Sequence, residues 1–215
     1  MYIQLTQRCN MSCPHCGFSC TYKGKDMTME TYRKVLKVAE DSGSYVALGG
    51  GEPTIHPMFL DMLGLAVIAQ VDSVWLATNG SQTEIALRLA YLAKSGLIGC
   101  ALSLDEWHDP IDPKVVKAFT KKDGEHDNSN DKREIRRVTT IHNAGRAKKN
   151  HIGKIPGCFC DDIFITPDGY IHPCGCSAGL KMDFGTVDKY DFPDNYSPGS
   201  CAKSRKFWDD ELEGR

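Results

Sequence analysis

The chain carries the stretch Cys9-Asn-Met-Ser-Cys13-Pro-His-Cys16 directly after a short apolar segment. These cysteines follow the spacing C-x3-C-x2-C, and a tight loop with this spacing can turn three thiolates toward one centre. Three thiolates on a four-iron cube leave one iron without a protein ligand, and a catalytic metal needs such an open position. The stretch therefore predicts a metal centre that can bind a further molecule.

Cys20 leaves a second interpretation open, because it extends the run to C-x3-C-x2-C-x3-C. That run resembles ferredoxin-type cysteine patterns, which close the cube and carry only electrons. The same thiols could also form a zinc site or stay without a metal.

Composition restricts the chain to an ordinary globular class. Its 215 residues are 41% hydrophobic and 25% charged, which argues against disorder and suits one domain with a small appendage. A net charge of -2 excludes a generic polycation. The longest apolar run is too short to span a membrane and the N-terminal sequence lacks a signal-peptide segment, so we expect a cytoplasmic protein without a membrane partner.

Short apolar strands alternate with helical segments as far as about residue 141. We expect strands at 2–6, 45–48, 73–77, 99–104 and 135–141. The first helix is expected to begin after the N-cap Thr28 and to end near Gly43, and further helices at 59–70, 84–94 and 113–120. Repeated βα units imply a parallel sheet, whose functional site lies at the carboxyl edge of the strands.

The second predicted strand ends in Gly49-Gly50-Gly51-Glu52-Pro53. A triple glycine alone indicates a turn, but one that ends in Glu, one strand after a three-cysteine loop, is much more specific. Together the two motifs resemble the radical SAM superfamily, whose signature is this cysteine spacing. The GGE motif of that family receives the ammonium of S-adenosylmethionine, here through Gly50, Gly51 and Glu52, and an ammonium needs acceptors at close backbone approach.

The resemblance implies a partial (β/α)6 barrel with a small cysteine-rich C-terminal module. It also implies a [4Fe-4S] cluster on Cys9, Cys13 and Cys16, whose open iron is chelated by the amino and carboxylate groups of S-adenosylmethionine. In the family, one electron from a donor such as flavodoxin or ferredoxin breaks a C–S bond of the cofactor. The resulting 5′-deoxyadenosyl radical abstracts hydrogen from the substrate.

The family also places polar residues that follow the later strands against the cofactor. The matching residues are Thr78, Asn79, Ser103, Asp105, Thr140 and Arg146. Ser103 and Asp105 fall on the same side of their strand and suit ribose hydroxyls, while Arg146 suits the cofactor carboxylate. The alternatives are ordinary caps and turns, and for Arg146 a solvated helix face.

Three further side chains are expected near the cofactor or the substrate. The family often has an aromatic residue near the adenine just before the third cysteine, where this chain has His15, and Phe18 follows shortly after. His108 follows Asp105 on the carboxyl edge of the fourth strand. A histidine titrates near neutral pH, so His108 is a candidate for proton transfer or substrate binding, and the alternative is a surface histidine.

Cys158-Phe-Cys160 and Cys174-Gly-Cys176 lie on either side of a predicted hairpin. A hairpin brings its ends together, so four thiolates can converge. Residues 167–174 and 184–187 are similar to the SPASM and twitch modules, which bind auxiliary iron–sulfur clusters, although the C-x-C spacing departs from their pattern. We expect a core at 1–154, a module at 155–215 and at most one second iron–sulfur cluster, with zinc or no metal as alternatives.

Residues 132–154 hold eight Lys and Arg against Glu134 alone, a local net charge of +7. This predicts a patch for the phosphates of a nucleotide or DNA, a solvated face, or a docking face for an acidic electron donor. A small barrel leaves its mouth open to a large substrate, which we expect to be a modified nucleobase in DNA, as in phage thymidine hypermodification or isomerisation, or a peptide side chain. The rival functions are a closed-cluster electron-transfer protein and a zinc-containing nucleic-acid-binding protein.

Overall fold

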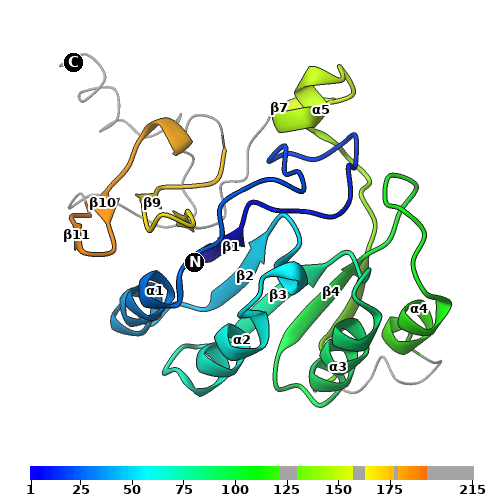
Figure 1. The fold of residues 1–215 in the computed structure, drawn as a ribbon, viewed down its shortest axis with the longest axis horizontal. Helices are drawn as coiled ribbons and strands as arrows, with labels where there is room; N and C mark the ends of the chain where they lie inside the picture. The colour runs from blue at the N-terminus through cyan, green and yellow to red at the C-terminus, as the bar shows by residue number, and fades with distance from the viewer. Residues whose placement is uncertain (122–129, 157–162, 177–178, 193–215) are drawn as a thin grey trace.

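The computed structural model describes residues 1–121, 130–156, 163–176 and 179–192 (Figure 1). The main sheet consists of β1 (Tyr2–Thr6), β2 (Val46–Gly50), β3 (Val74–Thr78), β4 (Gly99–Ser103), β5 (Arg133–Arg136), β8 (Phe164–Ile165) and β9 (Ile171–His172). Their order is β5-β4-β3-β2-β1-β8-β9. Every neighbouring pair from β5 to β8 in this order is parallel, and β9 is antiparallel to β8.

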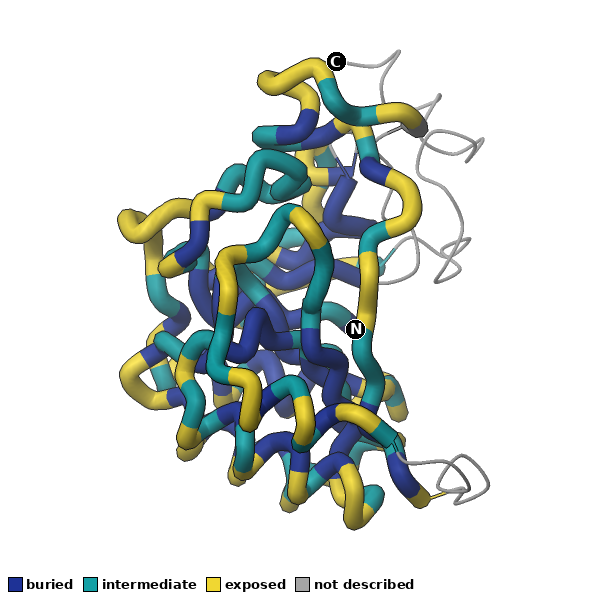
Figure 2. The backbone as a smooth tube through the Cα atoms, turned by 90° about the vertical axis from the view of Figure 1, so that its right-hand side faces the viewer, coloured by how far each residue is buried: buried dark blue, intermediate teal, exposed yellow. Residues whose placement is uncertain are grey.

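Four helices cover one face of this sheet (Figure 1). They are α1 (Met29–Asp41), α2 (Phe59–Ile68), α3 (Thr83–Lys94) and α4 (Pro113–Phe119). Alternate strand residues, such as Ile3, Leu5 and Leu48, are buried against them together with Tyr32 and Phe59. Figure 2 shows the buried backbone gathered inside the molecule and the exposed backbone on its outer turns.

The remaining elements are short. They are η1 (Pro53–Ile55), β6 (His142–Asn143), α5 (Gly145–Lys149), β7 (Ile155–Pro156), η3 (Gly179–Lys181), β10 (Gly185–Thr186) and β11 (Lys189–Tyr190). The strands β6 and β7 pair with each other, and so do β10 and β11. In the described part of the chain, no helix is long and apolar enough to cross a membrane.

The fold class agrees with the predicted partial barrel, and the first four strands and helices lie close to their predicted ranges. Thr28 caps α1 as expected, since its hydroxyl accepts a hydrogen bond from the backbone N–H of Thr31 at 3.1 Å. The predicted hairpin is also confirmed as β8 and β9. Because β8 extends the sheet beyond β1, part of the predicted C-terminal module belongs to the same sheet as the core.

The predicted fifth strand at 135–141 is wrong by several residues, because β5 spans Arg133–Arg136. A charged residue can begin this strand because Asp131 neutralises the buried Arg133, whose Nε lies 2.9 Å from the carboxylate. Pairing of Arg133 with Cys100 and of Arg136 with Ser103 fixes the register. Thr140 therefore lies in an exposed bend beyond the strand rather than at its end.

Candidate functional site

A cavity of about 850 Å³ lies on the sheet face opposite the four helices. Ala47, Trp75 and Ala77 on the strands line its floor. Ligand pockets commonly have volumes of about 300–1,000 Å³, so this cavity can hold a sizeable molecule. The predicted site residues that line it are Cys9, Cys13, His15, Cys16, Phe18, Gly50, Gly51, Glu52, Thr78, Asn79, Ser103 and His108. Asp105, Thr140 and Arg146 are not among the lining residues.

The loop after β1 brings Cys9, Cys13 and Cys16 to the wall of this cavity. All three are partly exposed, so their thiols are accessible from one shared space. This donor set fits an iron–sulfur cluster, because such clusters take thiolate ligands and need room on one side of the loop. Cys20 is buried but lines the same cavity. The cavity therefore contains three thiols for an open cluster and a fourth thiol that could close it.

The thiols of this loop differ in acidity. A hydrogen bond from Cys20 lowers the pKa of Cys16 to about 5, and Cys20 is held as the protonated partner. Burial raises the pKa of Cys13 to about 11, and burial also raises the pKa of Cys9. Cys16 is therefore the thiol of this loop that deprotonates most readily.

The glycine run at the end of β2 lets two strand ends approach closely. Gly50 has a φ of +149°, and a Cβ on Gly51 would lie 2.1 Å from the carbonyl oxygen of Arg8. The backbone N–H of Gly50 donates to the hydroxyl of Tyr2 at 2.9 Å, and that of Gly51 donates to the carbonyl of Thr6 at 2.8 Å. The motif thus joins β2 to the strand that carries the cysteine loop.

The Glu52 carboxylate is buried, with 1% of the residue exposed. Its Oε1 accepts hydrogen bonds from the hydroxyls of Thr54 and Thr78 at 2.6 and 2.7 Å, and from the Thr54 amide at 3.2 Å. Its Oε2 accepts one from the amide of Asn79 at 2.7 Å. Burial raises the pKa of Glu52 and these bonds oppose the rise. Glu52 therefore links the end of β2 to the end of β3 by hydrogen bonds. Its Oε2 accepts one of these bonds and has a second lone pair for another donor.

Asn10 and Tyr2 belong to the site although sequence reasoning did not single them out. The Asn79 side chain donates to Asn10 at 3.0 Å, and Asn10 donates to Ser81 at 2.7 Å, which links the cysteine loop to the end of β3. No motif marks Asn10. Strand alternation marks Tyr2, because it faces away from the buried Ile3.

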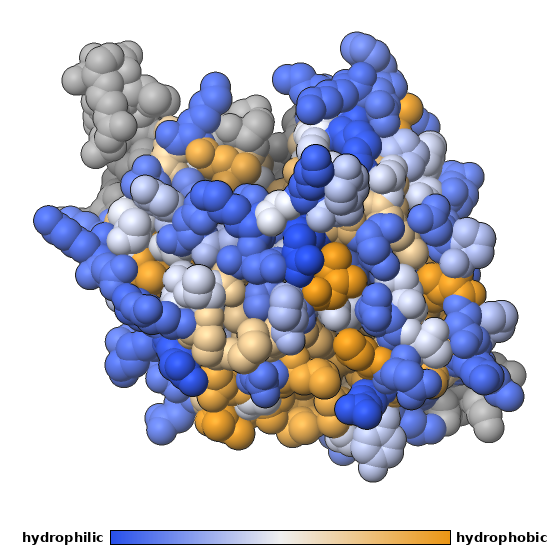
Figure 3. Space-filling model, viewed as in Figure 1, coloured by the Kyte–Doolittle hydropathy of each residue, from blue (hydrophilic) through white to orange (hydrophobic). Residues whose placement is uncertain are grey.

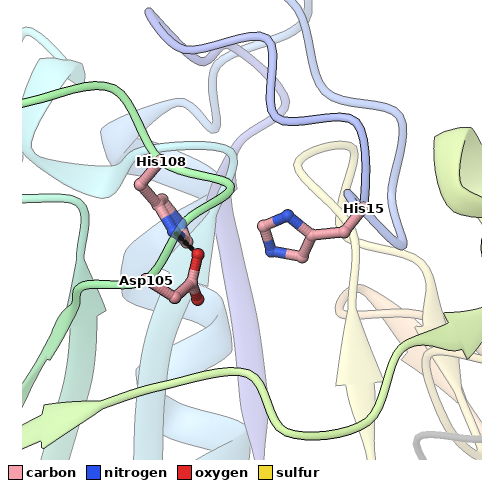
Figure 4. Close-up of side chains that lie close together, drawn as sticks. All are labelled: His15, Asp105 and His108. Atoms are coloured by element: carbon pink, nitrogen blue, oxygen red, sulfur yellow. Dashed lines mark hydrogen bonds and ion pairs between the residues drawn. The ribbon is translucent and has the colours of Figure 1, made fainter.

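The side chains of His15, Asp105 and His108 converge at one edge of the cavity (Figure 4). One ligand atom of each lies within 4.8 Å of the others, and the two imidazole rings are 5.1 Å apart. The Asp105 carboxylate accepts hydrogen bonds from His108 Nδ1 at 2.8 Å and from the amides of Trp107 and Val138 at 2.9 and 3.1 Å. The buried Nδ1 of His15 has no hydrogen-bond partner among the described residues.

The acidities of this group suit an ionised Asp105. Burial would raise the pKa of Asp105, but the hydrogen bonds from His108 and the two amides outweigh burial and lower it. An ionised carboxylate accepts only, so Nδ1 of His108 carries the proton of their hydrogen bond. Burial lowers the pKa of His15, which favours its neutral form.

Phe18 lies on the opposite flank of the cavity in a stack of three rings. Its ring centroid is 6.1 Å from that of Tyr2 and 5.5 Å from that of Phe164. Tyr2 and Phe164 are nearly parallel at 5.2 Å, with an interplanar angle of 7°. The two side chains predicted near the adenine therefore lie apart. His15 is grouped with Asp105 and His108, and Phe18 with Tyr2 and Phe164.

Of the second cysteine group, Cys174 and Cys176 are buried with their Sγ atoms 3.3 Å apart. Gly175 between them lines the cavity, so this pair lies next to the site. Cys158 and Cys160 lie outside the described residues. The convergence of all four thiols stays a prediction.

Comparison with known proteins agrees with the geometry. The model of the Radical SAM superfamily matches residues 3–157. The chain is 32% identical over 109 residues to "Molybdenum cofactor biosynthesis protein 1" of Bos taurus, and 33% identical over 106 residues to "Mycofactocin maturase MftC" of Mycobacterium ulcerans (strain Agy99). These matches cover 48% and 47% of this chain but only 17% and 28% of those relatives.

The fold is similar to that of BtrN in complex with AdoMet and 2-DOIA, with a TM-score of 0.57 at 15% identity. This similarity covers 87% of the present chain and 77% of the BtrN chain. The family match includes the three-cysteine loop, the glycine motif and the strands β1 to β5. The chain belongs to the radical SAM superfamily.

Proposed function

We propose that this chain cleaves S-adenosylmethionine reductively at a [4Fe-4S] cluster on Cys9, Cys13 and Cys16. The cofactor pair supplies a 5′-deoxyadenosyl radical, which abstracts hydrogen from the substrate. One observation carries this proposal: the three thiols line the same cavity as the Gly50-Gly51-Glu52 motif. Family membership supports both cofactors.

We assign proton transfer in this reaction to the pair of Asp105 and His108. Asp105 holds Nδ1 of His108 as a donor, so Nε2 is left to accept a proton from the substrate or return one. Two backbone amides fix the carboxylate, which keeps the imidazole in one orientation. The ring of His15 lines the same cavity and faces this pair.

The substrate we propose is a large molecule that presents a peptide side chain or a modified nucleobase at the cavity. The structure weakens the argument for DNA, because Arg133 is paired with Asp131 and Arg136 with Glu134. Stimulation of 5′-deoxyadenosine release by peptides or by modified DNA distinguishes the two. Only DNA binding should weaken steeply with salt.

The experiment that tests the function is 5′-deoxyadenosine formation by the anaerobically reconstituted protein with a strong reductant. We expect product from the wild type and none from Cys13→Ala. Cys20→Ala is the matched control, because Cys20 lines the same cavity but is not needed for an open cluster. A Cys20→Ala protein that loses its iron would instead support the closed, electron-carrying cluster.

We further propose that Cys174 and Cys176 bind a second iron–sulfur cluster, in a module of the SPASM/twitch type. Their neighbouring sulfur atoms supply half of a four-thiolate site. Replacing both by Ala should reduce the iron content and leave 5′-deoxyadenosine formation from the first cluster. A wild-type protein that loses zinc rather than iron on this double substitution would contradict the iron–sulfur assignment.

A further inference from the structure

The backbone of the cysteine loop is held from outside by Arg146, at the start of α5. The amide of Arg146 donates to the carbonyl oxygen of Cys16 at 2.8 Å. Its guanidinium donates through Nη1 to the carbonyl oxygen of Cys13 at 2.7 Å, and through Nη2 to that of Cys20. One residue thus binds the loop at three cysteines, more than 120 positions earlier in the chain.

Neighbouring residues reinforce this contact. The side chain of Asn150 donates to the carbonyl oxygen of Pro14 at 3.0 Å. Gly145 has a φ of +51°, and a Cβ there would lie 2.2 Å from the carbonyl oxygen of Gly17. Only glycine tolerates both the conformation and the close approach. The start of α5 is therefore fitted to this loop, and Figure 1 shows the two segments side by side.

The charge of Arg146 is not neutralised by a carboxylate among the described residues; the partners of its guanidinium are carbonyl oxygens. Both carbonyl oxygens that bind the guanidinium belong to the cysteine loop, so the positive charge lies beside this loop. The sequence resemblance assigned Arg146 to the cofactor carboxylate, but its side chain does not line the cavity.

We propose that Arg146 is a positioning residue of the cluster site, which fixes the cysteine loop through its carbonyl oxygens and favours the reduced cluster through its charge. The inference rests on the proposed [4Fe-4S] cluster. Reduction adds one negative charge to a cluster, so a nearby cation stabilises the reduced state more than the oxidised state. Net charge around a cluster is one of the factors that set its potential.

The test uses the anaerobically reconstituted protein and its Arg146→Gln, Arg146→Lys and Lys148→Gln variants. Arg146→Gln should lower the ratio of reduced to oxidised cluster at a fixed solution potential about tenfold, which is about 59 mV for a one-electron couple. Arg146→Lys keeps the charge but cannot bind two carbonyl oxygens as a rigid fork, so its ratio should stay within about threefold of the wild-type ratio. Its iron should be lost severalfold faster to a chelator.

Lys148→Gln is the matched control, because it removes an exposed charge from the same helix and should change neither quantity. An Arg146→Gln protein with wild-type potential and iron retention would overturn the inference. So would an Arg146→Lys protein that keeps its iron as long as the wild type. If Arg146→Gln weakens the binding of S-adenosylmethionine but leaves the reduction potential of the cluster unchanged, the role of Arg146 is to bind the cofactor carboxylate, and the inference is wrong. A wild type without a [4Fe-4S] signal would instead contradict the proposed function.

Discussion

The carboxylate of Glu52 shows how one buried acid can organise a site. Glu52→Gln keeps the shape but replaces an acceptor oxygen by a donor, so buried donors of Thr54, Thr78 or Asn79 lose their partner. We expect a loss of about 1–3 kcal/mol in the free energy of unfolding, measured by urea denaturation. The control Glu30→Gln, on an 81% exposed side chain, should change it by less than about 0.5 kcal/mol. An equal loss of unfolding free energy in the two variants would contradict a stabilising role for the hydrogen bonds of Glu52.

The buried pair of Asp131 and Arg133 predicts a pH dependence of stability. The hydrogen bonds from Arg133 lower the pKa of Asp131 from 3.8 to about 2. A carboxyl with a depressed native pKa stabilises the fold fully above its unfolded pKa and loses that contribution as the pH falls through the native value. Denaturant unfolding should therefore lose about 2 kcal/mol between pH 4 and pH 2 from this group. Asp131→Asn should remove this slope, and an unchanged slope would contradict the assignment.

Local sequence predicted which thiols share one cavity but not the contacts that hold their loop in place. The spacing of Cys9, Cys13 and Cys16 is local, so one loop of sequence was enough to predict their convergence on one cavity wall. The carbonyl contacts of Arg146 and the link from Asn79 to Asn10 join residues far apart in the chain. They depend on the packing of whole elements, which no single pattern records.

Among the elements, α1 provides a clean test of local signals. Its N-cap Thr28 accepts the hydrogen bond from Thr31, and Gly43 ends the turn with a φ of +58°. Thr28→Ala should cost about 1 kcal/mol of unfolding free energy, seen as a lower thermal midpoint. Thr28→Ser retains the acceptor oxygen and should stay near the wild type. A serine variant as unstable as the alanine variant would rule out the cap.

Local hydrophobic patterns explain why the ranges of some strands were predicted more accurately than others. The strands β1 to β4 are apolar runs that end in glycine or polar motifs, and their ranges were predicted closely. The strand β5 has the sequence Arg-Glu-Ile-Arg, and its first residue is buried only because Asp131 neutralises it. Charge pairing across two residues is invisible to a hydrophobic pattern, so the prediction moved to the more apolar residues that follow.

For the whole molecule, we propose that electrons enter through the surface near α5. Lys148, Lys149 and Lys154 are exposed beside the segment that holds the cysteine loop, whereas the hydrophobic side chains seen in Figure 3 gather over α2, where Leu60 and Ile68 are exposed. An acidic donor such as flavodoxin is our proposed partner for the lysines.

Changing Lys148 and Lys149 to Glu should slow cluster reduction by flavodoxin at least about tenfold at low salt, with a smaller effect at high salt, as stopped-flow absorbance can measure. Reduction by dithionite should change much less. Lys117→Glu, on the distant helix α4, is the control. Equal slowing by Lys117→Glu would point to net charge rather than to a docking surface.

The pairing of β1 with β8 has a consequence for the order of assembly. Residues 2–6 and 164–165 are neighbours in the sheet, and the cysteine loop follows directly after the first of them. At about 5–20 residues per second of translation, roughly 10–30 s separate the two strands. During synthesis the thiols of the cysteine loop are therefore present before β8 can pair with β1. That interval is open to iron delivery and equally to oxidation, so the yield of active protein depends on the oxygen present while the chain is being made.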